Sequence, residues 1–389
     1  MSTEKISAKP QLKIAWLLPF MGTGGISFQH LLCEFSQIYP QTITFTGGWP
    51  GYAKGFADTF AIEQVGATRY IKLGQTPTGY SIGFSYVSPN IAWKLLKYRP
   101  DVVLVNAFSV WTAIALLLKP IGRWQVILIL EGGSPSVNYE RASLRILLRR
   151  FLARQVDAFV ANGQRARDYL TKVVGAAPNR VFDRPFLVPS LKALEQSESA
   201  LNLEDLTLAK PVFLYVGQLI ARKGFINLIE ACSILMQQGA QDFSLLVVGD
   251  GEQRAELEAI AASKGLQDKI RWLGKVPYSS LGQYFKLGDV FIFPTYEDIW
   301  GMVLTEAMAY GKPVICSEGA GAAEMVLQEE NGMVYDPHQP KDLAKYMSRF
   351  IDEPELIETM GHKSQEIMSQ HTPSDAITSF ARAVSLVAN

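Results

Sequence analysis

The run VFLYVGQLIARKGFINLIEA, residues 212–231, decides the fold of the second half of the chain. Its first five residues are all apolar, which is typical of a strand that is buried on both faces of a parallel sheet. Gly217 ends the apolar run, and a helix-like pattern follows Gly224. One buried strand followed by one helix is the repeating unit of an α/β domain.

The same unit recurs along the whole chain. Four more apolar runs follow in the second half: SLLVVG (244–249), KIRWLG (269–274), DVFIFP (289–294) and KPVICS (312–317). The first half contains LKIAWLL (12–18), TITF (42–45), DVVLVN (101–106), QVILIL (125–130) and DAFVAN (157–162). This alternation predicts an α/β fold with two doubly wound Rossmann-like domains. Such sheets bind ligands at the carboxyl ends of their strands, so we expect a site in a cleft that both domains face.

The length of 389 residues also favours two domains, because one hydrophobic core rarely organises so long a chain. Residues 191–210 are polar and acidic without a strand pattern, which predicts a linker between residues 1–190 and residues 211–374. Residues 375–389 predict a C-terminal helix that could pack back onto the first domain. The apolar residues on one face of this helix are Ile377, Phe380, Ala381, Val384 and Val387.

The two halves carry opposite charge, although the formal net charge of the chain is zero. Residues 1–190 contain 21 Lys and Arg against 10 Asp and Glu, a net charge of +11. Residues 191–389 contain 16 against 27, a net charge of −11. A basic half indicates contact with something anionic, such as a lipid surface, a phosphate-bearing acceptor or nucleic acid. Attraction between the two halves explains the asymmetry equally well.

The three cysteines, Cys33, Cys232 and Cys316, lie far apart and form no CxxC pair. Neither a disulfide framework nor a zinc site is therefore predicted, and a reducing compartment fits this pattern. The apolar run from Ile14 to Phe20 is too short for a signal peptide or a membrane span. We therefore expect a cytoplasmic protein.

The segment PTYEDIWGMVLTEAMAYGKPVICSEGAGAAE, residues 294–324, places a strand end, an acidic loop and a helix start in succession. The unpaired amides and the macrodipole of a helix start favour an anion such as a diphosphate. The backbone amides predicted to bind it belong to Trp300, Gly301, Met302 and Val303. Gly301 has no side chain to hinder the close approach of a ligand.

Two carboxylates accompany this helix start. Glu306 lies on the helix and could accept hydrogen bonds from ribose hydroxyls, and Asp298 lies on the loop and could hold hydroxyls of a transferred sugar. Taken alone, either acid would more commonly be a residue near a helix N-cap or on a solvated helix face. Their place beside a predicted anion site favours the functional interpretation.

Arg222 and Lys223 follow the strand that ends at Gly217. As a glycosidic bond breaks, negative charge builds on a leaving nucleoside diphosphate, and fixed cations stabilise that charge. A site of this kind needs no metal ion and no other cofactor. For an isolated Arg-Lys pair, a solvated basic turn would be the ordinary alternative.

The order G-x-L-x-x-x-K-G, then V-x-G-x-G, then acid-x7-Glu-Ala-Met over residues 211–370 resembles the retaining group 1 glycosyltransferases. The resemblance implies a GT-B fold, a first domain that binds the acceptor and a second that binds a nucleoside-diphosphate sugar. It implies that Lys223 binds the diphosphate, that Glu306 binds the ribose, and that Asp298 binds the donor sugar. The backbone near Val276, at the end of WLGKV (272–276), would lie beside the nucleobase.

Two residues depart from the family pattern. Gln218 stands where many members have Arg directly after the strand-end Gly, so Arg222 is the candidate for that charge. The first acid is commonly Glu in the family, whereas here it is Asp298, preceded by Glu297. The choice between these two acids stays open.

The first half contributes two further candidates. Gly24 and Gly25 lie in the loop PFMGTGGISFQHL (19–31), and the resemblance implies that this loop faces a phosphate or sugar. The loop is not a dinucleotide fingerprint, because the third glycine of that motif is replaced by Ser27. Glu131 lies where many family members have His. It is the catalytic candidate of the first domain and could orient the sugar or the incoming hydroxyl, or it could cap the following turn.

The segment RASLRILLRRFLAR, residues 141–154, predicts an amphipathic helix rich in Arg. Such a helix could rest on an anionic membrane leaflet. Its apolar residues could equally cover the sheet of the first domain.

Together these features predict an enzyme that moves a sugar from a nucleoside-diphosphate donor to a hydroxyl of a glycan, lipid or lipid-linked acceptor with retention of configuration. The expected partners are the sugar nucleotide, the acceptor and an anionic surface on the inner face of a membrane, without nucleic acid. The alternatives are a sugar-nucleotide epimerase or hydrolase on the same fold and a non-catalytic glycan-binding module. The broken glycine fingerprint disfavours a nucleotide-dependent oxidoreductase.

Overall fold

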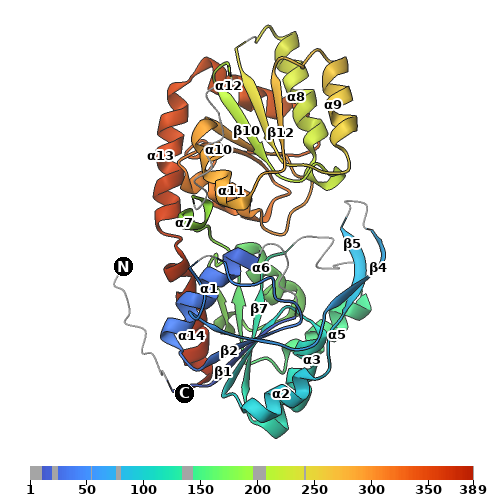
Figure 1. The fold of residues 1–389 in the computed structure, drawn as a ribbon, viewed down its shortest axis with the longest axis vertical. Coiled ribbons are helices and arrows are strands. Elements are labelled where there is room, and N and C mark those ends of the chain that lie inside the picture. The colour runs from blue at the N-terminus through green and yellow to red at the C-terminus, as the bar shows by residue number, and fades with distance from the viewer. Residues whose placement is uncertain are drawn as a thin grey trace. The chain divides into compact units, whose positions relative to one another are not determined.

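The computed structural model describes residues 11–19, 25–53, 55–75, 80–133, 143–195, 207–240 and 242–388 (Figure 1). By its contacts the chain divides into two compact units. The first unit comprises Met1–Thr76, Ser81–Val188 and His371–Asn389, and the second comprises Pro77–Tyr80 and Pro189–Gln370. Each unit is built around an open parallel sheet.

The first unit contains a seven-stranded sheet in which every neighbouring pair is parallel. In spatial order its strands are β3 (Ala61–Gln64), β2 (Thr42–Thr46), β1 (Ile14–Leu18), β6 (Val102–Asn106), β7 (Gln125–Leu130), β8 (Ala158–Ala161) and β9 (Val181–Asp183). Strand β1 pairs with β2 on one side and with β6 on the other, so the strand order reverses there, as in a doubly wound sheet.

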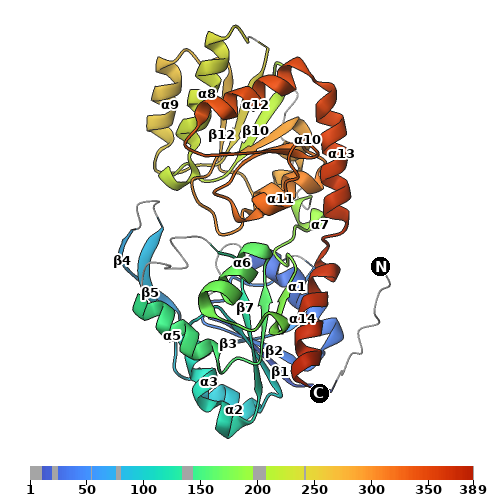
Figure 2. The same cartoon turned by 180° about the vertical axis from the view of Figure 1, so that it is seen from behind.

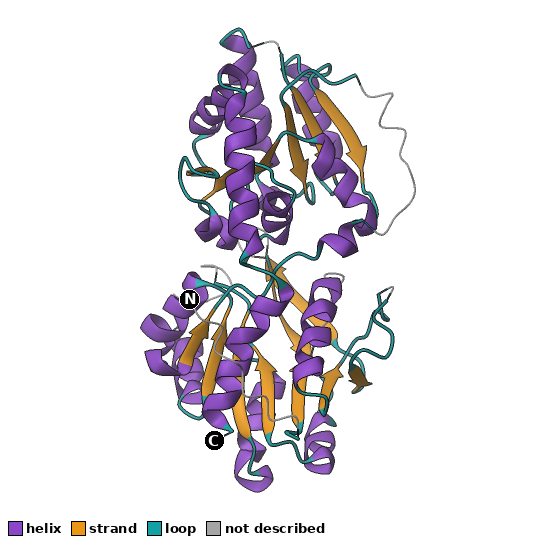
Figure 3. Ribbon diagram, turned by 90° about the vertical axis from the view of Figure 1, so that its left-hand side faces the viewer, coloured by secondary structure: helices purple, strands orange, loops and turns teal. Residues whose placement is uncertain are grey.

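Helices cover both faces of this sheet (Figure 3). One face packs against α1 (Gly25–Ile38) and the last helix, α14 (Pro373–Val387). The other packs against α2 (Ile91–Tyr98), α3 (Val110–Gly122), α5 (Ser143–Ala153), α6 (Gln164–Asp168) and the π-helix η1 (Tyr169–Val174). The ring of Phe380 in α14 lies 5.2 Å from that of Trp16 in β1. The C-terminal helix therefore returns to the first unit, as its apolar face predicts.

The second unit contains a six-stranded sheet that is also parallel throughout. In spatial order its strands are β12 (Ile270–Gly274), β11 (Ser244–Val248), β10 (Val212–Val216), β13 (Val290–Phe293), β14 (Val314–Ser317) and β15 (Gly332–Tyr335). Its longer helices are α8 (Phe225–Gln237), α9 (Arg254–Ser263), α10 (Leu281–Leu287), α11 (Met302–Ala309), α12 (Pro340–Asp352) and α13 (Glu355–Ser369). Strand order reverses at β10, between β11 and β13.

Every apolar run quoted from the sequence coincides with a strand, and the two doubly wound sheets are confirmed. Three of the four edge strands of these sheets were not predicted: β3, β9 and β15, which are only three or four residues long. An antiparallel hairpin of β4 (Arg69–Gln75) and β5 (Ser81–Tyr86) was not predicted either. An edge strand pairs with only one neighbour, and part of its surface stays exposed. It therefore lacks the long apolar run of a central strand.

The described start of the predicted linker packs on the second unit. A short helix, α7 (Leu191–Leu194), buries Leu194 completely, and Glu195 forms an ion pair of 2.7 Å with Lys286 of α10. Residues 196–206 of the predicted linker lie outside the described residues. In the described part of the chain, no helix combines the length and the apolar character needed to cross a bilayer.

Candidate active site

Glycines allow the loops after three neighbouring strands of the second unit to approach one another closely. Gly217, Gly249 and Gly274 follow or end β10, β11 and β12. Gly249 has φ +142°, and a Cβ there would lie 1.8 Å from the carbonyl oxygen of Gly217. A side chain at this position would collide with fixed backbone, so glycine is required. The amide of Leu219 then donates to the carbonyl oxygen of Asp250 at 3.0 Å, which fixes the loop that follows β10.

The loop after β10 is also bound to the loop after β13. The carbonyl oxygen of Arg222 accepts hydrogen bonds from the amide of Tyr296 at 2.9 Å and from the hydroxyl of Thr295 at 3.1 Å. Gly224 has φ +63°, and a Cβ there would lie 2.2 Å from the carbonyl oxygen of Pro294. The side chains of Arg222 and Lys223 are therefore held opposite the acidic loop.

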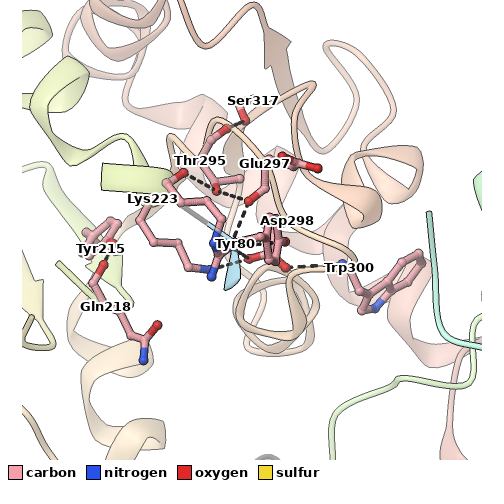
Figure 4. A network of polar contacts seen from close by, with 10 residues as sticks. Tyr80, Tyr215, Gln218, Lys223, Thr295, Glu297, Asp298, Trp300 and Ser317 are labelled. Atoms are coloured by element: carbon pink, nitrogen blue, oxygen red, sulfur yellow. Dashed lines mark hydrogen bonds and ion pairs between the residues drawn. The ribbon is translucent and has the colours of Figure 1, made fainter. Parts of the chain in front are cut away.

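Lys223 contacts the carboxylate of Asp298 (Figure 4). Arg222 approaches the same carboxylate. The Nζ atom of Lys223 donates to Oδ2 of Asp298, and Nη1 of Arg222 lies 3.4 Å from the same oxygen. Their side chains are only 12–16% exposed, so solvent screens these charges weakly. The two cations and the first acid predicted from the sequence thus form one cluster.

The pKa values of this cluster follow from burial and from its charges. Burial lowers the pKa of Lys223, and the carboxylate of Asp298 only partly opposes that shift. Burial alone would raise the pKa of Asp298, but Lys223 and Arg222 outweigh it and hold that pKa below its usual value. Asp298 is therefore ionised at neutral pH.

Asp298, rather than Glu297, presents its carboxylate to the cations. The backbone carbonyl oxygen of Glu297 accepts a hydrogen bond from Nη1 of Arg222 at 2.9 Å. The same guanidinium lies 4.4 Å from the ring centroid of Tyr80, which belongs to the second unit. Backbone and ring contacts thus fix Arg222 beside Asp298. Gln218, which stands where many family members have Arg, is exposed.

Helix α11 begins where the sequence predicts an anion site. Its N-cap residue, Gly301, has φ +97°, a conformation that other residues adopt rarely. The amide of Trp300 donates to Oδ1 of Asp298 at 3.3 Å. The first amides of a helix have no partner in a preceding turn, so those of Gly301, Met302 and Val303 lie at the positive end of the helix dipole.

Glu306 is buried within α11, with 3% of its surface exposed, and is not a residue of a solvated helix face. The hydroxyl of Tyr278 donates to its Oε1 at 2.7 Å. Burial raises the pKa of Glu306 to about 7, and the hydrogen bond from Tyr278 opposes this shift. Val276 is half-buried in the loop after β12, two residues before Tyr278.

The candidates of the first half of the chain lie in the first unit. Glu131 follows β7, and its Oε1 accepts a hydrogen bond of 2.8 Å from the side-chain amide (Nδ2) of Asn106 at the end of β6. Burial raises the pKa of Glu131, and the bond from Asn106 opposes that shift. Gly25 begins α1, and Gly24 lies outside the described residues.

Three residues near the site went unnoticed in the sequence analysis: Tyr80, Tyr278 and Thr295. Tyr278 follows a strand end and a Pro in KVPYSS (275–280), which is a position where polar site residues often occur. No local signal marks Tyr80, which is 142 residues from Arg222 in the sequence.

The fold and this cluster define a class of protein. Parallel α/β units whose strand-end loops carry cations, beside a helix start and a buried carboxylate, are ligand-binding units of the nucleotide-binding type. Residues 202–367 match the model of a family described as "Glycosyl transferases group 1". This match lies within the second unit and confirms the resemblance of that unit to the group 1 glycosyl transferases.

Curated relatives agree with this family. The chain is 26% identical over 239 residues to alpha-D-kanosaminyltransferase of Streptomyces kanamyceticus, a match covering 59% of this chain and 61% of that protein. It is 25% identical over 318 residues to D-inositol 3-phosphate glycosyltransferase of Streptomyces griseus, covering 74% and 63%. The chain thus spans less than two thirds of the length of each of these relatives.

Solved structures extend the likeness to the whole fold. Anabaena Alr3699/HepE in complex with UDP aligns with a TM-score of 0.72 and 18% identity, covering 97% of this chain and 100% of that one. At such identity the likeness concerns the fold alone. The fold is that of the GT-B glycosyltransferases, with two Rossmann-like domains, as predicted.

Proposed function

We propose that this protein transfers a sugar from a nucleoside diphosphate to an acceptor hydroxyl with retention of anomeric configuration. The observation that carries the proposal is the cluster at the start of α11, where Lys223 and Arg222 meet Asp298. Glu306 lies buried on the same helix. A cationic site, a helix start and two carboxylates match the diphosphate, ribose and sugar of one donor.

Each residue has a distinct role in the proposed reaction. Lys223, Arg222 and the amides of Trp300, Gly301, Met302 and Val303 bind the diphosphate. Glu306 accepts hydrogen bonds from the ribose, Asp298 binds hydroxyls of the sugar, and the backbone near Val276 contacts the base. The bond between the anomeric carbon and the diphosphate oxygen breaks, and its electron pair leaves with the diphosphate. The acceptor oxygen bonds to the same face of that carbon and passes its proton to the departing phosphate.

In this proposal, the first unit binds the acceptor. Glu131, held by Asn106, is a carboxyl group at the carboxyl edge of that sheet and is suited to orient an acceptor hydroxyl. A glycan, lipid or lipid-linked acceptor is consistent with this role. The loop of Gly24 and Gly25 would face the phosphate or sugar.

A donor and acceptor screen tests the proposal. UDP-sugars come first, because the similar Anabaena structure contains UDP. Mass spectrometry should detect a sugar added to a glycan or glycolipid acceptor, and NMR should show the donor's anomeric configuration kept. Free sugar or an epimerised donor in the absence of acceptor would instead identify a hydrolase or epimerase. Donor binding without any turnover would identify a binding module.

Transfer is expected to proceed without a divalent metal. Lys223, Arg222 and the start of α11 supply the positive potential that a bound cation supplies elsewhere. Turnover in about 5 mM EDTA should equal turnover in buffer, since no step of the proposed mechanism is metal-bound. Activity that disappears in EDTA and returns with magnesium or manganese would overturn this expectation.

Asp298→Asn is expected to separate nucleotide binding from sugar transfer. Without donor, the carboxylate of Asp298 offsets part of the positive charge of the two cations in the diphosphate site. Its removal should tighten the binding of free nucleoside diphosphate several-fold and lower kcat about tenfold or more, because a charged contact to the sugar is lost. Calorimetric titration and steady-state kinetics measure the two effects.

Glu297→Gln is the matched control for that variant, since the carboxylate of Asp298 is the one that contacts Arg222 and Lys223. Glu297→Gln should leave kcat within a few-fold of the unmodified protein. If Glu297→Gln abolishes transfer while Asp298→Asn does not, the assignment of the sugar-binding acid is reversed.

A further inference from the structure

Helix α5 packs on the first unit through its basic side. Nη1 of Arg149 donates to the hydroxyl of Tyr169 at 2.5 Å, and its guanidinium lies 5.5 Å from the ring centroid of Phe108. Ala153 is buried in the core beneath the helix. Arg149, Ala153 and the half-buried Ile146 share one face at helical spacing, and this face contacts the unit.

The opposite face of α5 is apolar and exposed. Its residues follow at intervals of three, one and three, which places them on one stripe of the helix. They are 57–79% exposed: Leu144, Leu147, Leu148 and Phe151. These four residues do not cover the sheet, which was one of the two interpretations of the sequence. Arg145 and Arg150 flank the stripe and are exposed, and so is Arg154, directly after the helix. The Nε atom of Arg150 donates to the carbonyl oxygen of Val173 at 2.9 Å.

The neighbouring helices continue this apolar surface. Helices α2, α3 and α5 lie next to one another on the same side of the first unit (Figures 1 and 2). Nζ of Lys119 in α3 donates to the carbonyl oxygen of Gln155, just after α5. Trp93 of α2 is 68% exposed, and Leu117 and Ile121 of α3 are 77% and 71% exposed. We call these three residues and the stripe of α5 the apolar patch.

A groove lies within this surface, between α2 and α3. Its volume is about 730 Å³. Apolar and cationic side chains line it together: Trp93, Leu96, Lys97, Arg99, Ile121 and Trp124. An exposed Trp beside a cation is a common feature of the region where lipid headgroups meet acyl chains.

The three helices that carry the patch contribute only positive charge, but two of their cations pair with acids of neighbouring segments: Lys94 with Glu63 and Lys119 with Asp157. The sequences of α2, α3 and α5 contain no Asp or Glu. They contain Lys94, Lys97, Lys119, Arg145, Arg149 and Arg150. A second copy of the chain seated on this patch by twofold symmetry would bring cations against cations. A polyanion in solution would match the charge but would leave the leucines in water.

We propose that the apolar patch and its cations dock on the surface of an anionic lipid bilayer, with α5 lying in the headgroup region parallel to the membrane plane. The exposed stripe buries its side chains at the boundary of the acyl chains, while Arg145 and Arg154 reach phosphates on either side. This goes beyond the proposed function, because it names the surface and the partner. It does not depend on sugar transfer.

Vesicle co-sedimentation tests the proposal on the full chain. Vesicles of phosphatidylcholine with about a third phosphatidylglycerol should bind the protein at low salt, and vesicles of phosphatidylcholine alone should bind it about tenfold less. Raising the salt to about 0.5 M should weaken binding to the anionic vesicles, because screening shortens the reach of the cations. Equal binding to both vesicle types, or binding to neither, would overturn the proposal.

Two variants separate the apolar and the electrostatic contributions. Leu147→Ser with Phe151→Ser should reduce binding about tenfold at both salt concentrations. Arg145→Gln with Arg154→Gln should reduce it about tenfold at low salt only. All four side chains are exposed, so thermal melting of these variants should be unchanged. Arg149 is left intact because it holds α5 on the unit.

Matched controls lie on other surfaces. Leu386→Ser removes an apolar side chain that is 48% exposed on α14, at the opposite face of the sheet. Lys341→Gln with Lys345→Gln removes two exposed charges from α12 of the second unit. Both controls should bind anionic vesicles like the unmodified protein. If they lose binding as strongly as the patch variants, the patch is not the docking surface.

Two further readouts make the test specific to this surface. Trp93 is the one tryptophan in the described residues that is mostly exposed, so its emission should shift to the blue on anionic vesicles and Trp93→Phe should abolish the shift. Light scattering should show the same oligomeric state for the unmodified protein and for Leu147→Ser with Phe151→Ser. A dimer that the double variant converts to a monomer would show that a second copy covers the patch.

Discussion

Lys223→Ala is expected to lower kcat/KM for sugar transfer about 100-fold or more. Lys223 is a cation only 12% exposed, next to the start of α11, where the proposed diphosphate leaves. Negative charge builds on the diphosphate as the glycosidic bond breaks, and a fixed buried cation stabilises that charge more in the transition state than in the bound donor. Steady-state kinetics at saturating acceptor measure the loss.

The variant also leaves Asp298 without its nearest cation, so stability has to be measured beside activity. Removing one partner of a buried ion pair costs roughly 3–5 kcal/mol when solvent is fully excluded, and somewhat less here. The double variant Lys223→Ala with Asp298→Asn should regain much of the lost stability but not the activity. Lys341→Ala, an exposed site in the same unit, should change neither quantity. Activity of Lys223→Ala within threefold of the unmodified protein would contradict the assignment.

The fold could be predicted well where several consecutive residues are buried, because such a segment is an apolar run in the sequence. The core strands β1, β6, β7, β10 and β11 lie between two layers of helices, so each reads as an uninterrupted apolar run. Strand β3, with the sequence AIEQ, is half-exposed at the edge of its sheet, and its composition does not differ from that of a loop. Its identity as a strand depends on pairing with β2, which is a tertiary contact.

Helix α5 shows how a correct pattern can leave its orientation open. Its amphipathic sequence predicts a helix, and the helix exists. The side of α5 that faces the protein is set by Tyr169 and Phe108, whose rings make cation–π contacts with the guanidinium of Arg149. Helical spacing cannot reveal such partners, because they belong to other elements.

The site could be predicted residue by residue but not as a network. The spacing from Asp298 to Glu306 and the pair Arg222-Lys223 are local features of the sequence. The ion pair between Lys223 and Asp298 joins residues 75 positions apart, and the bond from Tyr278 to Glu306 spans 28. These contacts arise because parallel strands deliver their loops to one edge of the sheet. They determine the protonation states on which the chemistry depends.

Glu306→Gln is expected to raise stability and to weaken donor binding. The ordinary pKa of a glutamate is 4.5, and burial raises that of Glu306 to about 7 in the folded protein. Between these values the folded state binds more protons than the unfolded state, so this residue makes the free energy of unfolding fall as pH rises. Above about pH 7 the penalty is complete, at about 3 kcal/mol for a shift of this size.

The gain in stability should therefore depend on pH in a defined direction. Glu306→Gln should melt several degrees above the unmodified protein at pH 8 and at nearly the same temperature at pH 4.5, where the glutamate is already neutral. Its affinity for a nucleoside diphosphate should fall tenfold or more at pH 8, because a neutral amide accepts ribose hydrogen bonds less strongly than a carboxylate.

Tyr278→Phe is the matched control: it removes the hydrogen bond to Oε1 of Glu306 that favours the ionised form of this carboxyl group. It should deepen the penalty at pH 8 and leave melting at pH 4.5 nearly unchanged. If Glu306→Gln raises stability no more at pH 8 than at pH 4.5, then burial does not destabilise the ionised carboxylate of Glu306.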